Sequence, residues 1–362
     1  MKYPVYCPDL SGNEKKYVNE CLDTEWISSK GHFVEDFEKA FAQRIGVKYA
    51  TSVFNCTVGI HLIATALGLG DGDEVICPAF TYIASANPFK QTGCKLVFCD
   101  SEEDTWQLDP EDVERKITPK TKAIVVVHLY GNAPNMEKIC SIARQHNLFL
   151  IEDCAEAMGT TYKGKHVGTF GDAACFSFFG NKTMTTGEGG MVVCNEPELY
   201  KRFRHLKAQG VVSWREYWHD EVAFNYRMTN IQAAIGLAQL ERLDQFLNRK
   251  REIAKEYETN LRSIPLKFLK QQTDTNCSYW MVSCLTQSEE ERKRLRQYLL
   301  NNGIETRPTF PSIHQMPVYS KQYIDLPIAQ SLSERGINLP SYPRLTTEDV
   351  SKICQVIKAF YE

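Results

Sequence analysis

The sequence contains no apolar run of about eighteen residues, the length that a helix needs to cross a bilayer. Its first residues also lack the continuous apolar stretch of a secretory signal peptide. Neither sign of charge dominates, because 42 Lys and Arg residues stand against 45 Asp and Glu residues, for a formal net charge of −3. A near-balanced chain has no global electrostatic attraction to nucleic acid or to an anionic membrane. We therefore expect a protein that binds neither.

The spacings typical of metal sites are missing too. The 13 cysteines form no C-x-x-C pair, and the eight histidines form no H-x-x-x-H pair. Such spacings place two ligands side by side, so their absence leads us to expect no metal site. The cysteine count is odd and the cysteines are scattered. In a chain without a secretion signal, this favours buried free thiols in the reducing cytoplasm over a disulfide framework.

A regular alternation of β-rich and helical segments fills the region from about residue 50 to 195. We expect a helix near 136–147, where Ile139, Ile142 and Ala143 have helical spacing. Near-continuous apolar strands separated by helices predict an α/β protein with a mostly parallel sheet covered on both faces. Such sheets bind ligands at the carboxyl ends of their strands. The expected strands are Val75–Pro78, Leu96–Asp100, Ala123–His128, Leu148–Asp153 and Met191–Cys194.

The pattern changes after Gly210. A polar, aromatic loop at Trp214–Asp220 precedes a helical run over Thr229–Leu247, and the remainder has an α+β rhythm. Hydrophobic residues make up 43% of the 362 residues, and this length favours two domains or one large one. We place a large domain at residues 1–247 and a smaller α+β domain at residues 248–362.

One lysine, Lys182, stands in a loop rich in small and hydroxylated residues just before the last expected strand. A lysine used for covalent catalysis needs surroundings that favour its neutral amine, and loops between apolar walls at strand ends provide them. Asp153 ends a buried-type strand, where an acid pairs with a protonated pyridine nitrogen or caps a helix. Taken alone, a loop lysine such as Lys182 is more often a solvated surface charge, and an acid at the position of Asp153 is more often a helix cap.

A third signal is the start of an apolar helical run at Phe54–Val58. Hydroxyl and amide groups at a helix N-terminus suit a phosphate, although Asn55 and Thr57 would also serve as simple caps. The glycines of Gly68–Gly72 precede an expected strand instead of following one, so they predict a turn. A nicotinamide-dependent dehydrogenase, which needs glycines after its first strand, is thereby excluded.

The order of these features resembles that of fold-type-I pyridoxal-phosphate enzymes, and more closely the DegT/DnrJ/EryC1/StrS family of nucleotide-sugar aminotransferases. The resemblance runs from Trp26 to Pro340 and includes the strings EDCAEA, GTFGD, FSFFGNKTMTTGEGG, YWHD and NYRMTN. It implies a large domain with a mostly parallel, seven-stranded sheet between helices, and a smaller C-terminal α+β domain. Pyridoxal 5′-phosphate (PLP) is the implied cofactor.

The resemblance also implies roles for individual residues. Lys182 is the catalytic residue, which bonds to the cofactor and later moves a proton between cofactor and sugar. Asp153 pairs with the pyridine nitrogen, Tyr82 stacks on the ring, and Glu156 contacts the ring hydroxyl. The implied phosphate-binding residues are Cys56, Thr57, Ser177 and, toward the neighbouring subunit, Asn225. The last role implies a homodimer with shared active sites. Relatives commonly have glycine where this chain has Cys56, so we expect its backbone amide, at ordinary φ, to donate to the phosphate.

The implied reaction moves the amino group of L-glutamate to C4 of GDP-4-keto-6-deoxy-D-mannose, giving GDP-perosamine and 2-oxoglutarate for a surface polysaccharide. Arg307, His314 and Tyr217 are the candidate substrate-binding residues. A UDP- or dTDP-linked 4-keto sugar is the alternative substrate. Lys182 argues against the dehydratase branch of the family, which has histidine there. Lys182 and Asp153 together argue against a PLP-binding protein without turnover.

Overall fold

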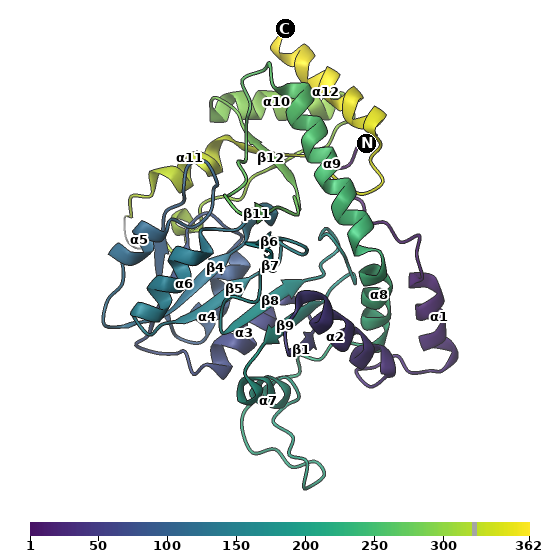
Figure 1. The fold of residues 1–362 in the computed structure, drawn as a ribbon, viewed down its shortest axis with the longest axis vertical. Helices are drawn as coiled ribbons and strands as arrows, with labels where there is room; N and C mark the ends of the chain where they lie inside the picture. The colour runs from purple at the N-terminus through teal and green to yellow at the C-terminus, as the bar shows by residue number, and fades with distance from the viewer. Residues whose placement is uncertain (321–323) are drawn as a thin grey trace.

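The computed structural model describes residues 1–320 and 324–362, and its centre is a seven-stranded sheet between two layers of helices (Figure 1). The strand order is β1-β9-β8-β5-β4-β2-β3, and every pair from β8 to β3 is parallel. Only β9 runs against its two neighbours. This confirms the predicted α/β class and the mostly parallel sheet. The strands are β1 (Tyr49–Val53), β2 (Glu74–Pro78), β3 (Lys95–Cys99), β4 (Thr121–Val127), β5 (Phe149–Asp153), β8 (Ala173–Ser177) and β9 (Gly190–Cys194).

Two apolar cores cover the faces of this sheet. Successive residues of β4 point to opposite faces, so Val125 belongs to one core while Ile124 and Val126 belong to the other. The first core is covered by α3 (Cys56–Ala66), α4 (Asn87–Gln91) and α7 (Pro197–Leu206). The second is covered by α2 (His32–Ile45), α5 (Pro110–Arg115), α6 (Met136–Gln145) and α8 (Asn230–Glu241), with α1 (Glu14–Asp23) packed on α8.

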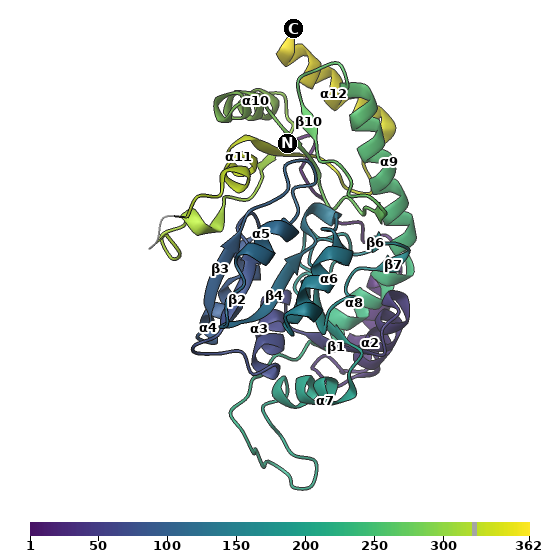
Figure 2. The same cartoon turned by 60° about the vertical axis from the view of Figure 1, so that its left-hand side comes forward.

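A second, antiparallel sheet forms the C-terminal part of the molecule. Its order is β10-β12-β14-β13, and a third apolar core packs it against α9, α10 and α12 (Figure 2). Its elements are α9 (Leu243–Leu261), β10 (Lys267–Phe268), β12 (Val282–Leu285), α10 (Glu289–Asn301), β13 (Arg307–Pro308), α11 (Pro327–Arg335), β14 (Gly336–Leu339) and α12 (Thr347–Tyr361). A small sheet of β6 (Thr161–Tyr162), β7 (Lys165–His166) and β11 (Thr275–Asn276) lies between the two parts.

The predicted division after residue 247 falls inside α9, which runs from one part into the other, and it stays a prediction. The N-terminus also joins the C-terminal part, because Tyr3 pairs with Ile304 and lies in the third core. The single helical run expected over 229–247 is two helices, α8 and α9. They are separated at Arg242, whose guanidinium donates two hydrogen bonds of 3.2 Å to the carboxylate of Asp9.

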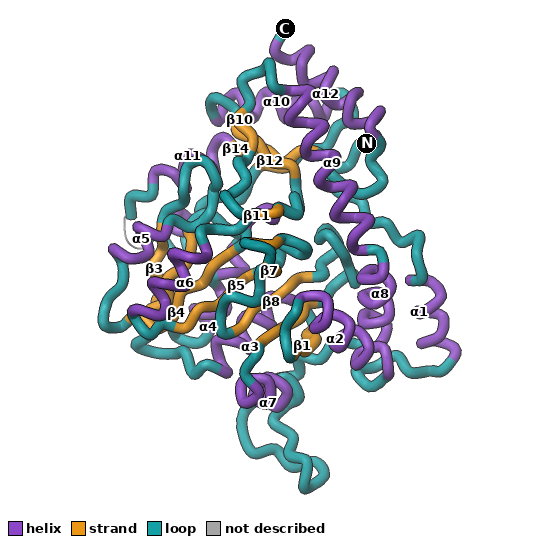
Figure 3. Tube along the Cα trace, in the orientation of Figure 1, coloured by secondary structure: helices purple, strands orange, loops and turns teal. Residues whose placement is uncertain are grey.

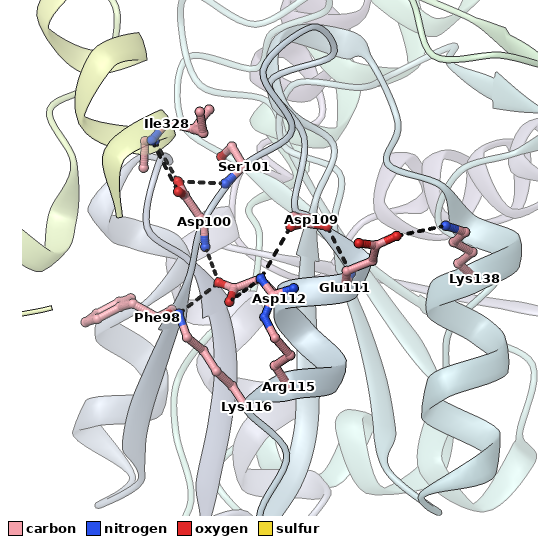
Figure 4. A network of polar contacts seen from close by, with 11 residues as sticks. Phe98, Asp100, Ser101, Asp109, Glu111, Asp112, Arg115, Lys116, Lys138 and Ile328 are labelled. Atoms are coloured by element: carbon pink, nitrogen blue, oxygen red, sulfur yellow. Dashed lines mark hydrogen bonds and ion pairs between the residues drawn. The ribbon is translucent and has the colours of Figure 1, made fainter. Parts of the chain in front are cut away.

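Asp100, at the end of β3, ties the two parts together (Figure 4). Its carboxylate accepts hydrogen bonds from the backbone N–H groups of Ile328 and Ala329, at 3.2 and 2.7 Å, in the first turn of α11. A carboxylate at this position satisfies N–H groups that have no acceptor inside the helix. The backbone N–H of Asp100 is held in turn by Asp112, which Lys116 neutralises at 2.8 Å.

The segment between α7 and α8 projects from the body as an extended arm (Figures 1 and 3). An isolated bridge between Val211 and His219 holds its two sides together, and Tyr217 near its tip is 93% exposed. Across the described ranges, no helix combines the length and apolar character needed to cross a membrane.

Candidate active site

A cavity of about 460 Å³ opens where the carboxyl ends of β4, β5 and β8 face β13 and β14 of the smaller sheet. This is the position at which parallel α/β sheets bind ligands. Eight of the residues singled out from the sequence line it, although they come from distant parts of the chain. They are Cys56, Thr57, Tyr82, Asp153, Glu156, Ser177, Lys182 and Arg307.

Asp153 ends β5 inside the cavity and is 3% exposed. One carboxylate oxygen accepts a 2.7 Å hydrogen bond from the hydroxyl of Ser85, and the other accepts a 2.9 Å bond from the backbone N–H of Ala155. Burial raises the pKa of Asp153, while these two donors and the charge of Lys182 lower it. These two hydrogen bonds hold the carboxylate in one orientation. Asp153 caps no α-helix, because the residues that follow it form turns.

Lys182 and Glu156 meet across the cavity. The Lys182 side-chain nitrogen lies 3.4 Å from Oε1 of Glu156 and 3.9 Å from the centre of the Trp280 ring. Oε2 of Glu156 accepts a 2.9 Å bond from the backbone N–H of Tyr130. Burial raises the pKa of Glu156 to about 7, against the opposing charge of Lys182. Glu156 can therefore exchange a proton near neutral pH.

The N-terminus of α3 forms another wall. The side chain of Asn55 caps this helix by accepting a 3.0 Å bond from the N–H of Val58. The N–H groups of Cys56 and Thr57, in the first turn, have no acceptor within the helix and suit an anion. Cys56 has ordinary helical geometry, so its amide can donate despite the side chain.

Gly190 allows the sheet to approach this helix end closely. A Cβ at position 190 would stand 2.8 Å from the backbone C of Asn55 and from the N of Cys56. Gly190 pairs with Ser177 on one side and with Val53 on the other, so the strand ends and the helix start converge here. We call the start of α3, with Ser177 and Gly190 beside it, the cradle; a side chain at 190 would clash with its backbone.

The three remaining candidates do not line the cavity within one chain. Asn225 is exposed at the base of the arm, paired with Ala208, and Tyr217 is near the arm tip. His314 is 6% exposed, and burial lowers its pKa. The charged groups that act on its pKa are Asp100, which raises it, and Lys116, which lowers it. The roles assigned to all three stay predictions.

Several residues that line the cavity were not predicted from the sequence. Ser85 follows the aromatic segment near Tyr82, but no spacing marks it as a partner of Asp153. Trp280 lies almost a hundred residues from Lys182, in a segment without a motif. Asn338 reaches the cavity through its pairing with Arg307 across β13 and β14. Tertiary contacts alone bring these side chains to the site.

A model of the DegT/DnrJ/EryC1/StrS aminotransferase family matches residues 8–358. The chain is 57% identical over 362 residues to the GDP-perosamine synthase of Escherichia coli O157:H7, covering 100% of this chain and 99% of the relative. It is 49% identical to the GDP-perosamine synthase of Vibrio cholerae, with 99% of each covered. A solved structure, the putative sugar aminotransferase Spr1654 from Streptococcus pneumoniae in its PMP form, superposes with a TM-score of 0.95 at 27% identity, covering 99% of this chain and 97% of that one.

The chain therefore belongs to the DegT/DnrJ/EryC1/StrS aminotransferase family, and it is a PLP-dependent aminotransferase. The cavity fits the cofactor. The cradle at α3 offers free N–H groups for a phosphate, Asp153 offers a buried carboxylate for a pyridinium nitrogen, and Lys182 offers an amine for a carbonyl carbon.

Proposed function

We propose that the protein transfers the amino group of L-glutamate to C4 of GDP-4-keto-6-deoxy-D-mannose, giving GDP-perosamine and 2-oxoglutarate. The observation that carries this proposal is the full-length identity of 57% to a GDP-perosamine synthase, in a chain whose Lys182 and Asp153 share one cavity. The same relatives favour the guanosine nucleotide over the UDP- and dTDP-linked 4-keto sugars.

When bound, PLP supplies the electron sink that makes the carbon next to the transferred nitrogen acidic. Asp153, buried and held by Ser85 and Ala155, keeps a positive charge at the pyridine nitrogen. Lys182 takes the proton from the amino donor and returns one to the sugar carbon. Glu156, 3.4 Å from the Lys182 nitrogen, holds that amine and would face the ring hydroxyl of the cofactor.

The phosphate group would be held by the N–H groups of Cys56 and Thr57 together with the hydroxyl of Ser177. These residues line the cavity, and Gly190 lies beside the start of α3. Arg307, at the opposite side, is the cation that would meet a carboxylate or a sugar phosphate. Tyr82 would cover the face of the cofactor ring.

The working enzyme would be a homodimer that completes each site across the interface. Two large side chains that line the cavity support this proposal, because Tyr82 is 57% exposed and Phe179 is 47% exposed. Large exposed apolar groups around a cavity favour coverage by another chain. Asn225 would reach the phosphate in the neighbouring subunit's site, and Tyr217 would line the neighbouring cleft or pack at the interface.

We place the reaction in the cytoplasm, as a step toward O-antigen or another lipopolysaccharide component.

An absorbance experiment tests both half-reactions. The purified protein with PLP should show a band in the near-ultraviolet or visible range that L-glutamate bleaches and GDP-4-keto-6-deoxy-D-mannose restores. Restoration only by the UDP- or dTDP-linked sugars would replace the proposed substrate but keep the reaction. No band after addition of PLP would overturn the role of Lys182.

A further inference from the structure

Besides Glu156, the indole of Trp280 contacts the side-chain nitrogen of Lys182. The centre of its indole ring lies 3.9 Å from the Lys182 side-chain nitrogen, whereas Glu156 lies at 3.4 Å only through a single oxygen atom. A cation held over an indole face is attracted by the negative face of the ring, and most strongly where water is excluded. Trp280 is 4% exposed, and the Lys182 side chain is 13% exposed.

The same indole also holds the backbone of the loop that carries Asn181 and Lys182, the lysine loop. Its Nε1–H donates a 2.7 Å hydrogen bond to the carbonyl oxygen of Asn181, the residue before Lys182. From the other side, the hydroxyl of Tyr6 donates to the carbonyl oxygen of Lys182. The peptide that carries the lysine is therefore fixed at two consecutive carbonyl groups.

Trp280 itself is held by a rigid aromatic cluster. Its ring is nearly parallel to those of Tyr130 and Phe310, at interplanar angles of 9° and 15° and centroid distances of 6.0 and 6.2 Å. Tyr130 comes from the large sheet side and Phe310 from the C-terminal part. The position of the indole thus depends on how the two parts pack.

Two residues next to this aromatic cluster have a strained backbone. Tyr130 has a φ of 54° and Tyr279 a φ of 49°, both in the left-handed region that non-glycine residues rarely adopt. Between them, Gly131 permits a contact that no side chain allows, since a Cβ there would lie 2.7 Å from the N of Tyr279 and 3.0 Å from the N of Trp280. Strain of this kind persists where the surrounding structure enforces one geometry, and it clusters at functional sites.

We propose that Trp280 is a further residue of the catalytic centre, whose indole face holds the protonated Lys182 amine and whose N–H positions the lysine loop. The inference rests on the proposed role of Lys182. In each state in which Lys182 is free of the cofactor, the amine must accept a proton and then deliver it from a defined place. The indole supports the protonated form without adding a competing acid or base.

The first test measures Lys182 without any turnover. The full-length apoenzyme is treated with acetic anhydride at about pH 7.5 and about pH 11, below and above the ordinary titration of lysine, and acetylation of Lys182 is measured by peptide mass spectrometry. Only the neutral amine reacts, so the acetylation rate at the lower pH divided by the rate at the higher pH reports the protonation of Lys182. An equal change of both rates reports a change in the access of the reagent to the amine. Trp280→Leu should raise this ratio about fivefold, and Trp280→Phe, which keeps a ring face, by about twofold or less.

The matched control is Trp106→Phe. Trp106 is a buried tryptophan of the same aromatic cluster, packed edge-to-face on Tyr130, and it does not line the cavity. This variant should acetylate as wild type does. Equal ratios in Trp280→Leu and wild type would overturn the inference.

The second test uses the enzyme with PLP and follows bleaching by glutamate. Trp280→Leu should lower the maximal rate about tenfold while the glutamate concentration for half-maximal rate changes less than about twofold, because the indole acts on proton transfer and not on substrate binding. A wild-type rate in Trp280→Leu would contradict the inference while leaving the proposed function intact. Absence of bleaching in the wild type would instead contradict the proposed function.

Discussion

The hydroxyl of Ser85 donates a 2.7 Å hydrogen bond to Oδ2 of Asp153, and it joins the end of a short 3-10 helix (Ile83–Ser85) to the end of β5 inside the cavity. Ser85 is 2% exposed, so no water replaces it easily. The bond lowers the pKa of Asp153 against the effect of burial, which favours the ionised carboxylate that a pyridinium nitrogen requires.

Ser85→Ala is therefore expected to weaken PLP binding about tenfold, since a hydrogen bond to a charged group contributes about 1.5–3 kcal/mol. Absorbance titration of the apoenzyme with PLP measures this affinity. Ser101→Ala is the control, because its buried hydroxyl has no hydrogen-bond partner among the described residues. Equal PLP affinity in Ser85→Ala and wild type would remove Ser85 from the site.

Lys182→Ala should lose turnover by a factor of about 10³ or more, because general acid–base catalysis and the covalent link to the cofactor disappear together. The variant should still bind PLP through Asp153 and the cradle at α3. Turnover and bound PLP are measured on the same preparation. Lys90→Ala changes an exposed lysine on α4 and should keep the wild-type rate. Wild-type turnover in Lys182→Ala would refute the assignment of the catalytic lysine.

Gly190→Ala tests the cradle. The added Cβ would stand 2.8 Å from backbone atoms of Asn55 and Cys56, so β9 and the start of α3 must separate. We expect PLP affinity to fall about tenfold, equal to about 1.4 kcal/mol. Gly180→Ala, whose Cβ would meet nothing closer than 3.9 Å, should bind PLP as the wild type does. Inorganic phosphate should protect the wild type from thermal unfolding more than it protects Gly190→Ala.

The burial of Lys250 predicts that the free energy of unfolding depends on pH. It is fully buried on α9, its amine donates to the carbonyl oxygen of Ser341, and burial lowers its pKa to about 7. In the unfolded chain a lysine titrates near pH 10.4, so between about pH 7 and pH 10 the unfolded state binds more protons. The free energy of unfolding must then rise with pH across this window, and the cost of burying the lysine is greatest below about pH 7.

Lys250→Met should remove that cost and raise the free energy of unfolding by about 2–3 kcal/mol near pH 6, with little difference near pH 10. Urea unfolding of both proteins at the two pH values measures it. Lys207→Met is the contrasting variant, because Lys207 is buried in an ion pair with Glu38 at 3.0 Å. Its loss removes one of two cations from the buried Glu38 carboxylate, since Arg204 remains at 3.2 Å, and should destabilise the protein by about 1.5–3 kcal/mol. A destabilised Lys250→Met at pH 6 would contradict the reasoning.

The sequence by itself determined the α/β class and five of the seven strands of the central sheet, because strands buried on both faces must be nearly continuous in apolar residues. The run from Ala123 to His128 predicted β4 (Thr121–Val127), and the pattern of Ile139, Ile142 and Ala143 predicted α6. The motifs around Lys182 and Asp153 also identified the family and its cofactor, since covalent chemistry and pyridinium pairing need those residue types at strand ends. These are local properties, carried by a few neighbouring residues.

Only the tertiary structure decided what surrounds those residues. Ser85 lies 68 residues from Asp153, and Trp280 lies 99 residues from Asn181, yet each pair is hydrogen-bonded in the fold. Arg242, between α8 and α9, likewise pairs with Asp9, which is 233 residues away in the sequence. A hydrogen bond or a ring contact between distant segments leaves no periodicity in the sequence, because its geometry arises from the packing of whole layers. The same reason applies to His314, which is buried and comes near Asp100 and Lys116 through the packing of distant segments.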